Sequence, residues 1–246
     1  MIKPGVTVVT PTGDRPYPFS LCCEYMQRQT MRPHQWIIMD DGNETMDLLN
    51  ERFHALQQLQ KITNVQHISR KRGKKEKGHS LRHQIVAALR YVEHEYVIFV
   101  EDDDWYHPRY LEEMLMMGSG KGEPLLFGQG VGAYYHIPTR SHYHYSNRDR
   151  ASLCQTGFHF SIRDLVQDAC LDSMTPFVDM RLWRRVRSKF LSFEKPLLCV
   201  GMKGLPGRPG TTMGWKRPDV FDADPNCYEL MKLITREDVE RYKQWL

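Results

Sequence analysis

The fold of this 246-residue chain is decided by the stretch Tyr96-Val97-Ile98-Phe99-Val100-Glu101-Asp102-Asp103-Asp104-Trp105-Tyr106-His107-Pro108. Residues 96–100 form an apolar run of the kind that a strand buried on both faces requires. Four carboxylates follow directly, where they repel one another and lose hydration. A divalent cation would offset that cost, and hard oxygen ligands suit Mg²⁺ or Mn²⁺. The sequence therefore predicts a metal site that grips a diphosphate, with an acidic turn capping the next helix as the alternative.

Two earlier strand predictions also end in polar clusters. Val6–Thr10 leads into Thr10-Pro11-Thr12-Gly13-Asp14-Arg15, and Trp36–Met39 leads into Asp40-Asp41-Gly42. Open parallel sheets bind ligands at the carboxyl ends of their strands, so three such clusters predict one shared site. The Asp-Gly pair could instead mark a simple turn. At a strand end, an aspartate can also accept a hydrogen bond from the N–H of a nucleobase.

Helical periodicity fills the segments between these strands. Apolar side chains recur three or four positions apart around 19–26, 48–56 and 81–92, and a helix over 109–117 follows a proline that suits its first turn. Val65–Ile68 adds another strand. This alternation of strand and helix predicts an α/β fold with a mostly parallel central sheet and helices on both faces.

The second half of the chain is less regular. Residues 125–146 hold short strand-like runs rich in tyrosine and histidine. We expect helices over Phe158–Ala169 and Asp179–Lys189, a strand over Leu197–Met202, and a loop over 201–214, which is rich in glycine and proline. Thr235 is expected to cap a last helix over 236–245. A chain of this length predicts a single domain.

The composition is that of an ordinary soluble globular protein, with 41% hydrophobic and 26% charged residues. No apolar run approaches the roughly 18 residues that span a bilayer. The N-terminus, Met1-Ile2-Lys3-Pro4, lacks the apolar core of a signal peptide. Six scattered cysteines without a CxxC pair argue against a zinc cluster. We therefore expect a reduced, cytoplasmic protein, in the host cytoplasm if it is viral.

A net charge of +4 includes two basic stretches. The first holds Arg70, Lys71, Arg72, Lys74, Lys75 and Lys77, and the second holds Lys203, Arg208, Lys216 and Arg217. Such stretches are either solvated loops or contacts to phosphate, whether of a nucleotide or of a nucleic-acid backbone.

Other positions admit both a chemical and a structural interpretation. Arg82 and His83 open a helix, where they could hold phosphate or form an exposed first turn. Asp179 could cap its helix or deprotonate an acceptor hydroxyl. His142 and His144 would share one face of a strand, although exposed histidines without a metal are the ordinary case. Dinucleotide-binding, P-loop and GxSxG motifs are absent from the sequence.

These residues resemble the inverting family 2 glycosyltransferases of GT-A fold. Val6–Thr12 is similar to the opening strand and nucleotide loop of that family, and Gln29-Thr30 to the end of its first helix. Ile37–Gly42 looks like the strand whose second aspartate contacts a uracil or thymine ring. Residues 96–108 resemble the DXD segment of the family, and Asp179-Met180-Arg181-Leu182-Trp183-Arg184 resembles the segment that carries its base.

The resemblance implies a role for each matching residue. Asp103 would be the principal metal ligand with Asp104 beside it, and Asp179 would be the general base. The donor-binding residues would be Thr10, Pro11, Thr12, Asp14, Arg15, Asp41, Arg82, Glu101, Asp102 and Arg208. The acceptor side would include His159 and Trp183. The single domain would comprise a nucleotide-sugar-binding half (1–117), an acceptor half (118–200), and a loop with the C-terminal helix (201–246).

The sequence departs from the family pattern at three places. Glu101 stands where the first DXD residue is usually Asp, and Leu81-Arg82-His83 stands about a turn away from the usual Ala-Arg-Asn. The tail, with Leu205–Gly210 and Trp215, is not general to the family. We expect Arg208 and the loop 203–217 to close over the donor pyrophosphate and exclude water.

The implied reaction is metal-dependent, inverting transfer from a UDP- or dTDP-type donor to a hydroxyl acceptor, such as a glycan of the cell envelope. The basic stretches also permit a phage-type DNA glycosyltransferase that modifies a hydroxymethylated pyrimidine, with a flipped base stacked on Tyr134, Tyr135, Tyr143 or Tyr145. A nucleotidyltransferase would need a Gly-rich, basic loop after the first strand, which Pro-Thr-Gly-Asp-Arg matches poorly. A non-catalytic nucleic-acid binder would carry four carboxylates that repel phosphate.

Overall fold

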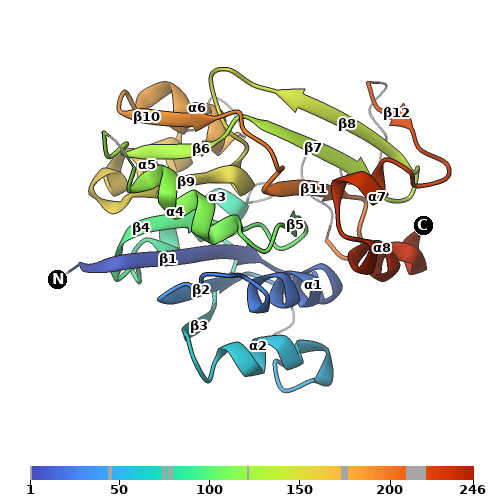
Figure 1. Ribbon diagram of the computed structural model, residues 1–246. Coiled ribbons are helices and arrows are strands. Elements are labelled where there is room, and N and C mark those ends of the chain that lie inside the picture. The colour runs from blue at the N-terminus through green and yellow to red at the C-terminus, as the bar shows by residue number, and fades with distance from the viewer. Residues whose placement is uncertain are drawn as a thin grey trace.

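The computed structural model describes residues 2–43, 46–73, 76, 80–120, 122–172, 177–208 and 220–246. Within them, a central sheet of seven strands has the order β10-β6-β9-β4-β1-β2-β3 (Figure 1). These strands are β1 (Lys3–Thr12), β2 (Gln35–Asp40), β3 (Asn64–Ser69), β4 (His94–Phe99), β6 (Leu126–Gln129), β9 (Thr156–His159) and β10 (Lys189–Ser192). Neighbouring strands are parallel except for the two pairs that involve β9. The predicted mostly parallel α/β sheet is therefore confirmed.

Helices cover both faces of this sheet. One face carries α1 (Pro16–Gln27), α2 (His54–Leu59) and α4 (Tyr110–Gly118), and the other carries α3 (Ser80–Ala88), α5 (Arg163–Leu171) and α6 (Val178–Arg185). Val8 and Val9 of β1 are both fully buried, yet they belong to different cores. Successive side chains of a strand point to opposite faces, so a continuous apolar run feeds both cores at once.

A second sheet lies on the side of the central sheet where its parallel strands end (Figure 1). Its order is β12-β8-β7-β11-β5, formed by β5 (Trp105–Tyr106), β7 (Val131–His136), β8 (Ser141–Ser146), β11 (Cys199–Lys203) and β12 (Asp222–Ala223). Strand β5 comes directly after the four carboxylates and pairs with β11. The pairing of β5 with β11 therefore holds the end of the acidic segment, residues 101–104, in place. The central sheet alone would leave this segment as a loop without a partner at its far end.

The structure corrects the bounds of two predicted helices. Phe158 and His159 belong to strand β9, and the helix begins only at Arg163, after a 3-10 turn over Phe160–Ile162. The helix expected over Asp179–Lys189 ends at Arg185. Short apolar runs suit helix and strand alike, and here strand pairing decides, because Phe158 lies between β4 and β6 in the sheet.

The C-terminal part contains α7 (Leu230–Leu233) and α8 (Arg236–Tyr242). Thr235 caps α8 as predicted, since its side-chain oxygen accepts a hydrogen bond from the N–H of Asp238. Strand β11 includes Gly201 and Met202, where the expected strand and the expected loop overlapped, and also Lys203, which was expected in the loop alone. Positions 209–214 of that loop lie outside the described residues. In the described part of the chain, no helix combines the length and the apolarity needed to cross a membrane.

Candidate active site

A cavity of about 720 Å³ opens where the central strands end. Its walls come from the end of β1, the segment after β4, the starts of α3 and α6, and the second sheet. Ten of the residues to which the family resemblance gave a role line it: Pro11, Thr12, Arg15, Arg82, Glu101, Asp102, Asp103, Asp104, Asp179 and Arg208. They converge because the carboxyl ends of parallel strands share one edge of a sheet.

Asp102 anchors the end of β1. It accepts hydrogen bonds from Thr12 Oγ1 at 2.6 Å and from Arg15 Nη1 at 2.8 Å. Arg15 Nη1 also lies 3.0 Å from Asp103 Oδ2. Burial raises the pKa of Asp102 to about 6, although the charge of Arg15 opposes that rise. One guanidinium group thus joins the loop after β1 to two of the four carboxylates.

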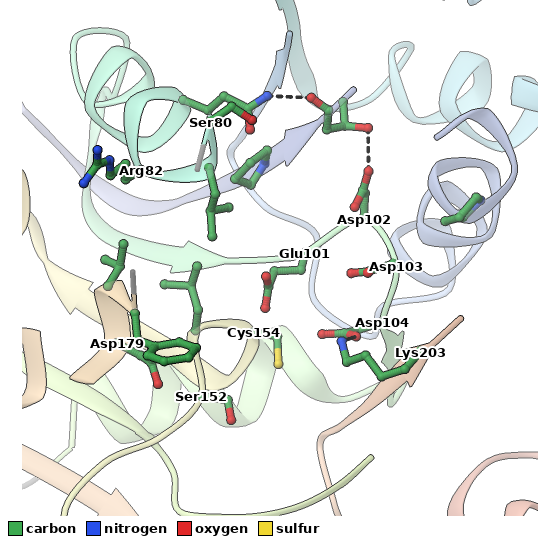
Figure 2. A pocket seen from close by; sticks show the side chains of 18 of the residues that line it. Ser80, Arg82, Glu101, Asp102, Asp103, Asp104, Ser152, Cys154, Asp179 and Lys203 are labelled. Atoms are coloured by element: carbon green, nitrogen blue, oxygen red, sulfur yellow. Dashed lines mark hydrogen bonds and ion pairs between the residues drawn. The ribbon is translucent and has the colours of Figure 1, made fainter. Parts of the chain in front are cut away.

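The buried Asp104 carboxylate pairs with Lys203, for which the sequence indicated only membership of a basic stretch. Lys203 Nζ lies 2.9 Å from Asp104 Oδ1, and the N–H of Met202 donates to the same oxygen at 3.1 Å. Figure 2 shows the amine of Lys203 reaching this carboxylate. Because 99 positions separate the lysine from the aspartate, no local pattern could have paired them.

Glu101 and Asp103 complete the carboxylate cluster. In Figure 2, Glu101, Asp103 and Asp104 follow one another along the segment after β4. Burial, together with the charge of Asp104, raises the pKa of Glu101 to about 8. Burial also disfavours ionisation of Asp103, but Arg15 and Lys203 outweigh it and lower the pKa of that carboxyl. The carboxylates outnumber these two cations, which favours binding of a further cation.

The oxygen atoms of this cluster suit a hard divalent cation. Asp104 Oδ2 is buried and has no hydrogen-bond partner among the described residues, and carboxylate oxygens are the ligands that Mg²⁺ and Mn²⁺ prefer. One ligand atom each of Asp104, Cys154 and Cys199 also lie within 4.8 Å of one another. Sulfur is a soft ligand, and burial raises the pKa of the Cys199 thiol to about 11. The two cysteines therefore do not suit these hard metals.

Asp179 approaches the cavity from a different wall. It lies in the first turn of α6 with its side chain 19% exposed, and Arg150 Nε is 3.6 Å from its Oδ2. Figure 2 shows it on the opposite side of the cavity from Asp103 and Lys203. Burial raises the pKa of Asp179 above its ordinary value of 3.8. A carboxylate with raised proton affinity that borders a cavity can act as a general base.

Asp41 does not line the cavity. Arg208 does line the cavity, and its side chain covers Asp41. Arg208 Nη2 donates to Asp41 Oδ1 at 2.6 Å, and the N–H of Arg208 donates to the carbonyl of Asp14 at 3.0 Å. Asp41 Oδ2 is buried without a partner in the described part of the chain. Gly13 makes this approach possible, since a Cβ there would lie 2.6 Å from Asp41 Oδ1 and 2.8 Å from Arg208 Nη2.

The basic stretches are only partly at the cavity. Arg72 lines it and lies 3.3 Å from Asp14 Oδ2, whereas Arg70 binds Glu76. Arg82 also lines the cavity and donates to His83 Nε2 at 3.3 Å. Lys71 is exposed and is not among the residues that line the cavity, and Lys74, Lys75, Lys77, Lys216 and Arg217 lie outside the described residues.

Three residues expected in the site serve elsewhere. Thr10 is buried and accepts a hydrogen bond from Trp36 Nε1 at 2.8 Å. His159 pairs with Tyr96 near the start of β4, because β9 runs antiparallel to β4 and ends at the opposite edge of the sheet. Trp183, one turn after Asp179, is 1% exposed and turned into the core. The acceptor-side expectation for His159 and Trp183 is corrected accordingly.

Tyrosines of the second sheet form an aromatic wall of the cavity. Tyr134, Tyr143 and Tyr145 line it, and the rings of Tyr134 and Tyr145 stack with centroids 4.9 Å apart. Tyr135 points to the other face of the sheet and donates to Asp224 Oδ2 at 3.1 Å. The alternation of side chains along β7 explains why one of the four predicted tyrosines is excluded from the cavity.

Comparison with known protein families gives a match to one sequence family over residues 7–163. The model of the family described as Glycosyl transferase family 2 matches residues 7–163, which include the end of β1, the acidic segment and strand β9. No curated protein matches the chain.

Similar folds occur among solved structures. S. aureus TarS is 11% identical, with 80% of this chain and 36% of that chain covered and a TM-score of 0.56. S. aureus TarS 1–349 in complex with UDP is 13% identical, with 80% and 60% covered and a TM-score of 0.58. The same fragment in complex with UDP-GlcNAc gives 13% identity, 80% and 58% coverage, and a TM-score of 0.55. The chain thus spans between 36% and 60% of the length of these three TarS chains.

Proposed function

The chain belongs to glycosyl transferase family 2, and from that premise we propose that it transfers a sugar from a nucleotide-sugar donor to a hydroxyl acceptor. One observation carries the proposal. Asp179 and the carboxylates of Glu101, Asp103 and Asp104 border a single cavity from separate walls. A proton acceptor on one side and a diphosphate site on the other is what a direct displacement at an anomeric carbon needs.

The donor nucleoside is assigned to the ends of β1 and β2. Asp41 Oδ2 is buried and unpartnered in the described part of the chain, so a nucleobase N–H would satisfy it. Uracil and thymine carry such an N–H, which favours a UDP- or dTDP-type donor. Complexes of S. aureus TarS 1–349 with UDP and with UDP-GlcNAc add support for the UDP type. Arg82 and Arg208 supply charge for the diphosphate.

Asp103 and Asp104, with Glu101 beside them, would hold Mn²⁺ or Mg²⁺, which supplies counter-charge to the departing diphosphate when bound. Arg15 and Lys203 hold two of these carboxylates in position through contacts of 3.0 Å to Asp103 and 2.9 Å to Asp104. The acidic segment is therefore positioned by the chain itself before any donor arrives.

Asp179 is the proposed general base. It takes the proton of the acceptor hydroxyl as that oxygen bonds to the anomeric carbon and the bond from this carbon to the diphosphate oxygen breaks. Attack on the face opposite the leaving group inverts the configuration. Arg150 favours the ionised, proton-accepting form of Asp179 against the effect of burial.

The aromatic wall supports two acceptor classes. Stacked rings such as Tyr134 and Tyr145 offer an apolar surface to a sugar ring, and a glycan of the cell envelope or a similar saccharide is the first candidate. The same rings could stack on a flipped, hydroxymethylated pyrimidine, and Arg72 and Arg150 at the cavity would suit a DNA backbone. DNA binding that weakens steeply with salt would favour the second candidate.

The test is a panel of UDP- and dTDP-sugars with Mn²⁺, with donor binding measured by calorimetry and nucleoside diphosphate release measured with glycan or hydroxymethylated DNA. We expect binding of at least one donor, and loss of metal-dependent binding in Asp103→Asn. Asp164→Asn is the matched control, since its side chain is 87% exposed on α5. Failure of every donor to bind, or undiminished binding by Asp103→Asn, would overturn the proposal.

A further inference from the structure

The face of strand β8 that points away from the cavity carries a second group of side chains that can bind a metal. His142 and His144 lie on one face of this strand, whereas Tyr143 and Tyr145 lie on the other and line the cavity. Glu229, the residue before α7, meets the histidines. One ring nitrogen of each histidine and one carboxylate oxygen of Glu229 all lie within 4.8 Å of one another.

The spacing of this group is close to that of a zinc site. His144 Nε2 is 2.9 Å from Glu229 Oε1, and the rings of His142 and His144 are 5.5 Å apart at 77°. Around a tetrahedral Zn²⁺ with bonds of about 2.0–2.1 Å, ligand atoms stand about 3.4 Å from one another. Small side-chain rotations would therefore bring the three ligand atoms around one ion. Two imidazoles and a carboxylate form a ligand set that zinc accepts.

One member of the group is unsatisfied in the protein alone. The Nδ1 atom of His142 is shielded from solvent and has no hydrogen-bond partner among the residues described. A shielded polar atom without a partner is unfavourable and rare in native structures. The unpaired nitrogen is thus an observation independent of the clustering, and it indicates a missing partner at His142.

The carboxylate is held in place by separate contacts. The N–H groups of Glu229 and Leu230 both donate to Asp224 Oδ2 at 3.1 Å, and the hydroxyl of Tyr135 donates to the same oxygen at 3.1 Å. These bonds fix the start of α7 against β7. The position of Glu229 beside β8 therefore does not depend on its pairing with His144.

We propose that His142, His144 and Glu229 form a zinc site with three protein ligands and a fourth position taken by water. The ion would join β8 to the start of α7, across 85 positions of sequence. It would also support, from behind, the strand that presents Tyr143 and Tyr145 to the cavity. This site lies apart from the carboxylate cluster and does not depend on the proposed sugar transfer.

The test is a titration of zinc chloride into metal-free protein, with Mg²⁺ in excess so that the hard carboxylate cluster is saturated. We expect one zinc per chain in wild type, and affinity lower by more than about tenfold in His144→Ala and in Glu229→Gln. Lys232→Met should bind zinc more tightly, since Lys232 Nζ competes for Glu229 Oε2 at 3.0 Å. His54→Ala is the control, because the side chain of this exposed histidine bonds to Gln58 within its own helix and is not part of the proposed site.

Two further readouts separate a ligand role from a structural one. Co²⁺ should give the intense visible absorption of a tetrahedral site in wild type, and His142→Ala/His144→Ala should lack it. Zinc should raise the Tm of wild type but not that of Glu229→Gln, while the metal-free proteins melt alike. Zinc binding that is absent from wild type, or equal in wild type and both ligand variants, would overturn the proposal.

Discussion

Arg208 Nη2 donates a hydrogen bond to Asp41 Oδ1 over 2.6 Å, although 167 positions of sequence separate the two residues. The carbonyl of Arg208 also accepts a hydrogen bond from Arg15 Nε at 2.7 Å. The arginine thereby joins the loop after β1 to the end of β2. It occupies one oxygen of the aspartate proposed to bind the nucleobase, and the other oxygen is buried without a partner in the described part of the chain.

Replacing Arg208 should weaken the donor site. We expect Arg208→Gln to raise the donor KM by about tenfold, the effect of losing one charge-assisted contact. Hydrolysis of the donor without acceptor should rise as well, because water reaches the pyrophosphate more easily. Initial rates over a donor series would measure both, with Arg90→Gln as an exposed arginine control. An unchanged KM and unchanged hydrolysis would remove Arg208 from donor binding.

Gly13 should tolerate no side chain. In Gly13→Ala the new Cβ would meet Asp41 Oδ1 at 2.6 Å and Arg208 Nη2 at 2.8 Å, at a φ of +156°. We expect the variant to be destabilised by about 1–3 kcal/mol and to bind the donor less tightly. Gly122→Ala separates crowding from backbone strain, since Gly122 has a φ of +89° but nothing within 4 Å of an added Cβ. Equal donor affinity of the two variants would argue against the crowding.

Lys203 should be needed to keep the Asp104 carboxylate buried. The side chain of Asp104 is 0% exposed and that of Lys203 is 16% exposed. We expect Lys203→Met to lower the free energy of unfolding by about 3 kcal/mol, because it leaves a buried charge unpaired. Urea denaturation of metal-free protein would measure this. The double variant Lys203→Met/Asp104→Asn should regain part of the loss, and a purely additive result would contradict the pairing.

Asp179 should matter for the chemical step and little for donor binding. We expect Asp179→Asn to lower kcat by about 10²–10⁴-fold, the usual contribution of a general base. The Kd of the donor should stay within about twofold, a difference of less than about 0.5 kcal/mol. Single-turnover rates and calorimetry would separate the two quantities. Transfer by the variant at the wild-type rate would exclude Asp179 as the base.

The pH dependence of kcat follows from the raised pKa of Asp179. Only the ionised form accepts a proton, so kcat should reach its plateau above that pKa and fall as pH decreases through it. The acidic limb should therefore lie above 3.8, the ordinary value for an aspartate.

Arg150 offers a control for this assignment. Its charge lowers the pKa of Asp179 against the effect of burial. Arg150→Gln should consequently move the acidic limb of the kcat profile to higher pH. A limb that stays in place would assign the titration to another group.

Several features of the site could be predicted because they are local. The apolar run before Glu101 required a buried strand, and its end had to carry the acidic residues to one edge of the sheet. Thr235 was recognisable as a helix cap for the same reason, since its partner Asp238 is three positions away. Alternation along β7 and β8 also determines which tyrosines share a face, once the strands are known.

Other features depended on strand direction. His159 follows an apolar residue in a stretch that suits helix or strand, and nothing nearby shows that β9 runs antiparallel to β4. That direction removes His159 from the cavity. Trp183 lies on the inward face of α6, and the packing of that helix against the sheet, rather than its sequence spacing, decides that it belongs to the core.

The sequence by itself determined the parallel sheet, the edge at which its polar clusters meet and the family to which the chain belongs, because apolar runs and strand-end residues are properties of short segments. Only the tertiary structure decided which charges meet: Lys203 with Asp104, Arg208 with Asp41, and Glu229 with His144. These pairs are 85 to 167 positions apart. Their contacts arise from the order of the strands and from the second sheet, which no local pattern of residues encodes.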